Sequence, residues 1–200
     1  MPGTERYERM GARQYDRKTL MYYLCRTPAN RRLLPAVAAI RHSKVLDVGL
    51  GTGAYTRLLL EEGKGNTVVG VDLYPHLCEL PITVHRGDAA QLRSLVGAER
   101  FDLVLSTWMT DYLSPDALRA FVEAARAVLA PGGELVTTVI ATYGFGFLYV
   151  RLAKLLRGVD KYTYRRRGIL EMLRDAGFES RRVYPLRSWC FPWAYLVRAR

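Results

Sequence analysis

Short apolar runs alternate with segments of helical periodicity along most of this chain. The runs have the length of buried strands, and between them apolar residues recur every three or four positions. The predicted strands span 44–48, 67–71, 82–85, 101–106, 133–140, 179–187 and 193–200. Strands that alternate with helices in this way predict an α/β fold, with a parallel sheet covered by helices.

Helices are predicted at 16–25, 29–40, 53–62, 89–96, 115–129, 145–157 and 165–176, with a short helix or turn near 75–79. The helix at 165–176 is followed by Gly177, and glycine commonly terminates helices because it adopts the left-handed conformation without strain. A chain of 200 residues suffices for one domain with a sizeable core. The longest uncharged run, 16 residues between Glu134 and Arg151, is too short to cross a membrane, and the polar start has no signal-peptide pattern.

The segment 47–53, Asp-Val-Gly-Leu-Gly-Thr-Gly, joins the first predicted strand to the next helix. Glycines let the backbone turn sharply and approach a ligand closely, and the helix start behind them offers free N–H groups to a polar or anionic ligand. Gly49, Gly51 and Ala54 also fit the dinucleotide fingerprint, so this loop alone leaves a dehydrogenase open.

Two further carboxylates follow strands. Asp72 ends the second strand, 19 residues after Gly53, where an acidic side chain can accept hydrogen bonds from both hydroxyls of a ribose. Asp88 follows the third strand, and Pro131-Gly132-Gly133 predicts a turn before the fifth. The spacing therefore indicates a nucleoside ligand without a 2′-phosphate.

In this order the motifs resemble those of class I S-adenosylmethionine-dependent methyltransferases of the small-molecule and lipid type (methyltransferase type 11-like), over residues 36–200. The resemblance implies a Rossmann-like, doubly wound sheet of seven strands in the order 3-2-1-4-5-7-6, with the last strand antiparallel. It implies S-adenosyl-L-methionine as cofactor. The implied cofactor residues are Asp47, Gly49, Gly51, Thr52, Gly53, Asp72, Leu73, Asp88, Ala89 and Thr107.

The acceptor is expected just past the fourth strand. Asp111 is the candidate catalytic base or acceptor-orienting group; the alternative is that it caps the next loop. Trp108, Tyr112 and Tyr143 are candidates to wall the acceptor, and Trp108 could equally be core. No Asn-Pro-Pro-Tyr sequence follows this strand, which argues against methylation of base amino groups. The three cysteines have no zinc spacing, and no metal is expected.

The predicted elements divide the single domain into four parts. Residues 1–40 are expected to form an N-terminal helical cover, 44–140 the cofactor-binding core, 141–176 the acceptor-side cover, and 177–200 the last two strands.

Charge separates the core from its flanks. Residues 1–44 carry a net charge of +7, residues 45–150 carry −5, and residues 151–200 carry +9. Basic, aromatic flanks suit an acceptor that is anionic or lies on an anionic surface. A helical wheel of 147–157 puts leucines 148, 152, 155 and 156 with Tyr149 on one face and the basic residues on the other. That helix is expected either to close the pocket as a lid or to meet an anionic membrane surface.

The sequence thus predicts a cytoplasmic methyltransferase, with or without peripheral membrane association, that acts on a small apolar or lipid-like acceptor. An RNA methyltransferase that uses the basic flanks, and a non-catalytic cofactor-binding protein that docks a partner, are the alternatives. Nucleic acid is the less favoured partner, and the oligomeric state is left open.

Overall fold

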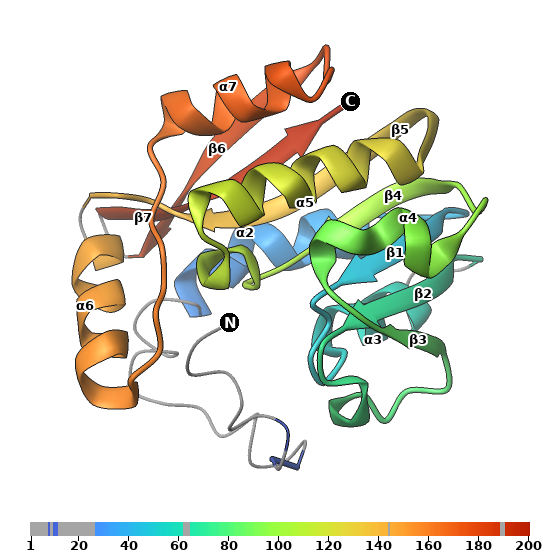
Figure 1. The fold of residues 1–200 in the computed structure, drawn as a ribbon, viewed down its shortest axis with the longest axis horizontal. Coiled ribbons are helices and arrows are strands. Elements are labelled where there is room, and N and C mark those ends of the chain that lie inside the picture. Colours follow the sequence, from blue (N-terminus) through green and yellow to red (C-terminus); the bar gives the residue numbers. More distant parts are fainter. Residues whose placement is uncertain (1–7, 9, 12–26, 62–64, 144, 189–190) are drawn as a thin grey trace.

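The computed structural model describes residues 8, 10–11, 27–61, 65–143, 145–188 and 191–200. In them the chain forms one sheet with helices on both faces (Figure 1). The helix predicted at 16–25 lies outside the described residues. Of the predicted N-terminal cover, the structure describes one helix, α2 (Thr27–Ala38).

The sheet has the predicted topology. Its strands are β1 (Lys44–Val48), β2 (Thr67–Asp72), β3 (Thr83–Arg86), β4 (Phe101–Ser106), β5 (Leu129–Ile140), β6 (Arg181–Ser188) and β7 (Phe191–Ala199). They lie in the order β3-β2-β1-β4-β5-β7-β6, and β7 is antiparallel to both of its neighbours. The strand order reverses between β1 and β4, and ligands of open α/β sheets bind beyond the carboxyl ends of the strands at such a point.

Helices cover the two faces unequally. The remaining ones are α3 (Ala54–Glu61), α4 (Leu92–Val96), α5 (Pro115–Val128), α6 (Phe145–Arg157) and α7 (Arg166–Asp175), with 3₁₀ turns η3 (Pro75–Leu77), η4 (Ala89–Gln91) and η5 (Thr110–Tyr112). Leu92, Phe121 and Leu173 bring α4, α5 and α7 into one buried cluster. Leu33 and Leu59 bring α2 and α3 into a second cluster on the other face. Since both faces are covered, the strands read as near-continuous apolar runs.

The start of α5 follows from its sequence. The Ser114 hydroxyl accepts a hydrogen bond from the Ala117 N–H at 3.3 Å and so satisfies one of the unpaired donors of the first turn. Pro115 occupies the first turn, where its fixed φ suits the helix, and Asp116 faces the positive end of the helix dipole.

The turn predicted at residues 131–133 is instead part of a strand. Leu129 is already extended and pairs with Phe101, so β5 begins where α5 ends and not at residue 133. The pairing is irregular between Phe101 and Leu103, and a side chain at Gly133 would lie 2.9 Å from the Phe101 carbonyl oxygen. Glycine is needed here for close strand approach.

Gly177 ends α7 as predicted. Its φ is +82°, its N–H donates to the Arg174 carbonyl at 2.9 Å, and the Phe178 N–H donates to the Leu173 carbonyl at 3.0 Å. This pair of hydrogen bonds is a Schellman motif, which only a residue tolerant of positive φ closes without strain.

The helical wheel expected for α6 is wrong. Leu148 and Leu155, expected on the face opposite the basic residues, are exposed on the same side as Arg151 and Lys154. Gly146 and Ala153 are buried on the inner face, and a side chain at Gly146 would lie 2.1 Å from the Ala141 carbonyl oxygen. No described helix is both long and apolar enough to span a membrane.

Candidate cofactor and acceptor site

The glycine loop after β1 has the conformation that its sequence demands. Gly49, Gly51 and Gly53 have φ values of +71°, +56° and +76°. A side chain at Gly49 would also lie 2.3 Å from the Met109 Cγ, and one at Gly53 would lie 2.6 Å from a methyl carbon of Leu80. Glycine is therefore required here both by backbone conformation and by close packing.

The Asp72 carboxylate braces this loop. Its Oδ2 accepts a hydrogen bond from the Gly51 N–H at 2.9 Å, and its Oδ1 accepts one from the Tyr74 N–H at 2.8 Å. Each carboxylate oxygen has a second lone pair, so a ribose can still be bound. Asp72 is half-buried at the carboxyl end of β2, beside Leu73, where a ribose-binding acid is predicted.

Asp47, the first residue of the glycine loop segment, has a buried side chain. Its Oδ2 accepts a hydrogen bond from the Thr56 hydroxyl at 2.5 Å. Its Oδ1 has no partner among the described residues. Burial raises the pKa of Asp47 to about 7; the Thr56 hydrogen bond opposes this rise, and the nearby Asp72 charge adds to it. A glycine cradle beside an unsatisfied buried acceptor fits S-adenosylmethionine, whose amino group is a cationic donor.

The predicted adenine pair lies on the neighbouring strand connection. Asp72 is in register with Arg86 of β3, and Asp88 and Ala89 follow directly, so all lie at the carboxyl edge of the sheet. The Asp88 carboxylate caps η4 by accepting the Ala90 N–H at 2.8 Å, and Ala89 is buried. Contact with adenine stays a prediction.

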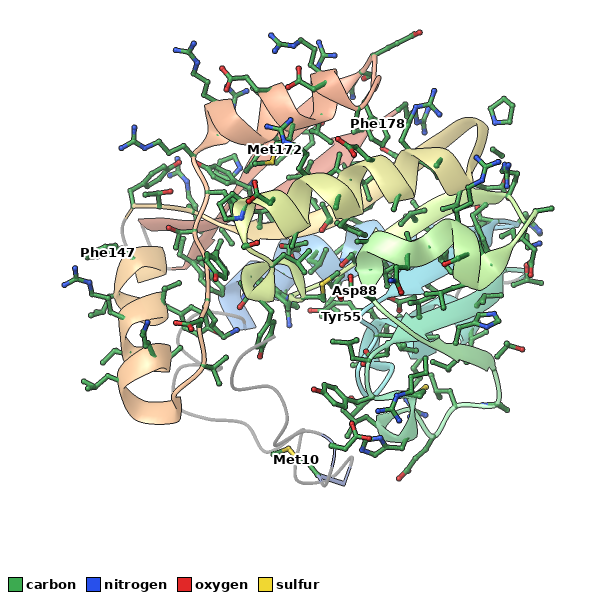
Figure 2. The ribbon with its side chains drawn as sticks, viewed as in Figure 1. Met10, Tyr55, Asp88, Phe147, Met172 and Phe178 are labelled. Carbon is green, nitrogen blue, oxygen red and sulfur yellow. The ribbon has the colours of Figure 1, made fainter. Side chains whose placement is uncertain are left out.

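Two described residues near the chain start lie against this same edge. Glu8 forms an ion pair with Arg86 at 2.8 Å, and the Met10 carbonyl lies 3.2 Å from the His76 ring nitrogen. Figure 2 shows Met10 among the side chains below β3. The segment before α2 thus reaches the predicted adenine side at these points.

Trp108 turns the chain sharply after β4. Its φ is +59°, an uncommon value for a residue other than glycine. Its backbone N–H donates to the Thr138 hydroxyl at 2.7 Å, and its indole N–H donates to the Tyr55 hydroxyl at 2.6 Å. The indole stacks on Trp193 at 5.1 Å between ring centroids, so the side chain is part of the core. A role in walling the acceptor stays a prediction. Thr107, just before it, is buried.

Asp111 is one half of a buried ion pair that the sequence did not predict. Its Oδ2 is paired with the Lys161 ammonium, and both side chains are almost fully buried. The Asp111 carbonyl also accepts the Tyr162 N–H at 2.7 Å. The segment after α6 is therefore attached to η5 by both main chain and side chain. Nothing local marks Lys161, since a lysine in a polar connection is ordinarily exposed.

Aromatic rings surround this pair. The Lys161 ammonium lies 3.7 Å from the ring centroid of Tyr112 and 5.1 Å from that of Tyr149 on α6. Tyr143 stands apart: it is about half exposed, and its described contact is with Tyr195, whose hydroxyl donates to the Tyr143 hydroxyl. The structure thus brings Asp111 and Tyr112 together, and it adds Lys161 and Tyr149. In the described part of the chain no three His, Cys, Asp or Glu side chains cluster as a metal site would need.

Comparison with known proteins agrees with this geometry. Residues 45–133 match the family model of a methyltransferase domain. The match covers a little under half of the chain, and together with the strand order and the glycine loop it supports a class I S-adenosylmethionine-dependent methyltransferase. The dehydrogenase alternative is set aside.

Solved structures share the fold. A Thermotoga maritima protein, described as a methyltransferase and possible histamine N-methyltransferase, is 18% identical with a TM-score of 0.71, and 98% of each chain is covered. A Mesorhizobium loti methyltransferase is 20% identical with a TM-score of 0.69, covering 86% of this chain and 97% of that one. The magnesium protoporphyrin IX methyltransferase of Synechocystis, solved with S-adenosylhomocysteine, is 15% identical with a TM-score of 0.68, covering 98% and 92%. No curated protein matches the chain by sequence.

Proposed function

We propose that this methyltransferase moves the methyl group of S-adenosylmethionine to a small apolar or lipid-like acceptor, in the cytoplasm or at a membrane facing it. The fold does not choose the acceptor, since it is shared by proteins named for magnesium protoporphyrin IX and for histamine. The proposal rests on the apolar and aromatic side chains that lie between the glycine loop and α6.

A series of contacts between the glycine loop, η5 and α6 is the observation that supports this proposal. Met109 packs against Gly49 of the glycine loop. Tyr112, three residues further on, lies under the Lys161 ammonium, and Tyr149 of α6 lies on the same ammonium. Aromatic and thioether side chains therefore lie next to the predicted cofactor loop. Such side chains favour a planar or apolar acceptor.

The residues of the site have simple tasks in a direct transfer. The cofactor, when bound, supplies an activated methyl on a sulfonium, so the protein mainly binds and orients the reactants. The glycine loop, Asp47 and Asp72 hold the cofactor. Asp111, fixed by Lys161, orients a polar atom of the acceptor or takes its proton if the acceptor must lose one.

Label transfer tests the acceptor class. The protein is incubated with S-adenosylmethionine labelled in the methyl group and, separately, with total lipid, RNA and polar small-molecule extracts. Label is expected in the lipid extract, and Gly51→Val serves as the control that cannot use the cofactor. Label in RNA alone would overturn the proposal. Cofactor binding without transfer to any extract would favour a non-catalytic, partner-docking role.

One observation favours the RNA alternative. The amino-terminal part of α7 and the residue before it present three consecutive exposed arginines, Arg165, Arg166 and Arg167, on the surface. Phosphate contacts made by arginines weaken steeply with salt. The RNA alternative would be favoured if the protein bound RNA, if this binding fell steeply with salt, and if it were lost when these three arginines are replaced by glutamine.

A further inference from the structure

The outer face of α6 combines apolar and cationic side chains in an unusual way. Phe147, Leu148 and Leu155 are 49%, 48% and 80% exposed, and they are among the few exposed large hydrophobic residues of the described chain. Figure 2 shows Phe147 on α6, directed away from the sheet. Large apolar side chains gathered on one exposed face mark an interaction surface more often than scattered ones do.

Packing does not require these side chains. The inner face of α6 lies on β7, where a side chain at Gly146 would be 2.9 Å from the Trp193 carbonyl oxygen. Ala153 is buried there, and Tyr149 meets Trp193 edge to face at 5.9 Å. The helix therefore has its hydrophobic contact with the core on the inner face, and polar residues on the outer face would leave that contact intact.

The charges on this face have one sign. The α6 sequence contains no Asp or Glu, and Arg151 and Lys154 are exposed among the apolar residues. The Arg151 guanidinium lies 4.6 Å from the centroid of the Phe147 ring, and Lys154 forms a surface ion pair with Asp160 at 2.9 Å. Long cationic side chains between apolar ones can keep their charges at lipid headgroups while their neighbours enter the acyl boundary.

We propose that this face of α6, made of Phe147, Leu148, Arg151, Lys154 and Leu155, docks on an anionic phospholipid surface with the helix axis in the plane of the interface. Charge complementarity selects this partner, because a cationic face attracts anionic lipid headgroups. The docking extends the proposed function without depending on it. An acceptor dissolved in that lipid would enter next to the segment that carries Lys161, which follows α6 directly.

The exposed surface of α7 provides an internal comparison. It carries three arginines, Arg166, Arg167 and Arg174, and no exposed large hydrophobic residue, and two of these arginines form ion pairs with acidic residues of the same helix. If exposed arginines alone brought the protein to lipid, α7 would also bind it, although its acidic residues leave α7 with a net charge of +1 against +3 for α6. The proposal requires that α6 act through its apolar residues also.

Vesicle sedimentation with the whole protein tests the proposal. The probes are vesicles of pure phosphatidylcholine and of phosphatidylcholine mixed with phosphatidylglycerol. The wild-type protein should bind the mixed vesicles and leave the neutral ones. Leu148→Gln/Leu155→Gln, which keeps charge and helix propensity, should lower binding by roughly tenfold or more, since withdrawing leucines from lipid loses their transfer free energy.

Matched variants separate the causes. Leu34→Gln/Leu60→Gln makes the same two changes at partly exposed leucines of α2 and α3 and should bind like the wild type. Arg151→Gln should weaken binding about fivefold, and Arg167→Gln should weaken it less, because a basic residue contributes only near the surface.

Several results would overturn the docking. They are absent binding, equal binding to both vesicle types, and a Leu148→Gln/Leu155→Gln variant that binds like the wild type. A wild-type dimer that the same variant turns into a monomer would assign this face to a second copy, and displacement of vesicles by RNA would assign it to nucleic acid. Methyl transfer to a detergent-dissolved lipid extract, measured in parallel, distinguishes failure of the docking from failure of the proposed acceptor class.

Discussion

The predicted cofactor side and the predicted acceptor side of this molecule are built by different means. The cofactor side is made of short loops, in which Gly49, Gly51 and Gly53 take left-handed conformations and Asp72 accepts backbone N–H groups. The acceptor side is made of side chains that meet across about fifty residues of sequence, such as Asp111 with Lys161 and Trp108 with Tyr55. The first kind of site depends on backbone conformation, and the second depends on pairs that one substitution can break.

The largest effect is expected from breaking the Asp111–Lys161 pair. Lys161→Met leaves a buried carboxylate without its counter-charge and should lower the free energy of unfolding by about 3–5 kcal/mol. Urea denaturation of the wild type and the variant measures this loss.

The double variant Asp111→Leu/Lys161→Met is the control, because it removes both charges. It should recover most of the lost stability. A double variant no more stable than Lys161→Met alone would show that the ion pair is not the cause.

A pH effect of similar size is expected from Asp47 in the absence of cofactor. Its pKa is raised from 3.8 to about 7 by burial, so the folded protein holds a proton that the unfolded chain releases. The stability gained from that proton is full below pH 4 and is lost as the pH rises towards 7. Asp47→Asn should therefore match the wild type at about pH 4 and exceed its stability above pH 7, by up to about 4 kcal/mol. Parallel pH dependences in the two proteins would contradict the assignment.

A smaller effect separates backbone strain from close packing in the glycine loop. Gly49→Ala meets Met109 and should cost about 2–4 kcal/mol of stability, from overpacking added to the left-handed conformation. Gly158→Ala has the same sign of φ but open space around it, and should cost only about 1–2 kcal/mol. Thermal unfolding of the two variants gives the difference. Equal losses would mean that Met109 moves aside freely.

The smallest effect concerns ribose binding by Asp72. Asp72→Ala should weaken S-adenosylmethionine binding by about 1–3 kcal/mol, because ribose hydroxyls in a buried site would lose their acceptor. Calorimetric titration measures it, and titration with NAD serves as the specificity control. Because Asp72 also braces Gly51, circular dichroism must show an unchanged fold before the loss is assigned to the ribose.

The same contrast explains what could be predicted from the sequence. Strand positions, the glycine loop and the end of α7 at Gly177 follow from local patterns, and the strand order followed from the motif resemblance. The partnership of Asp111 with Lys161 could not be predicted, because neither periodicity nor spacing links two residues of different connections. The separation of apolar from basic residues on α6 was mispredicted because apolar residues lie on both sides of this helix, so periodicity did not define one apolar face. The start of β5 was missed because Pro131, Gly132 and Gly133 ordinarily make a turn.

The direct passage from α5 into β5 has a consequence for tolerated changes of length. Along β5, Leu135 and Val139 belong to one buried cluster, and Val136 and Ile140 belong to the other. Both sets are aliphatic. Hydrophobicity alone therefore hardly determines which set faces which cluster. If the irregular stretch between Leu129 and Glu134 did not take up the change, one residue added between Val128 and Leu129 would exchange the two sets. The covalent join to α5, more than the choice of side chains, keeps this central strand the right way round.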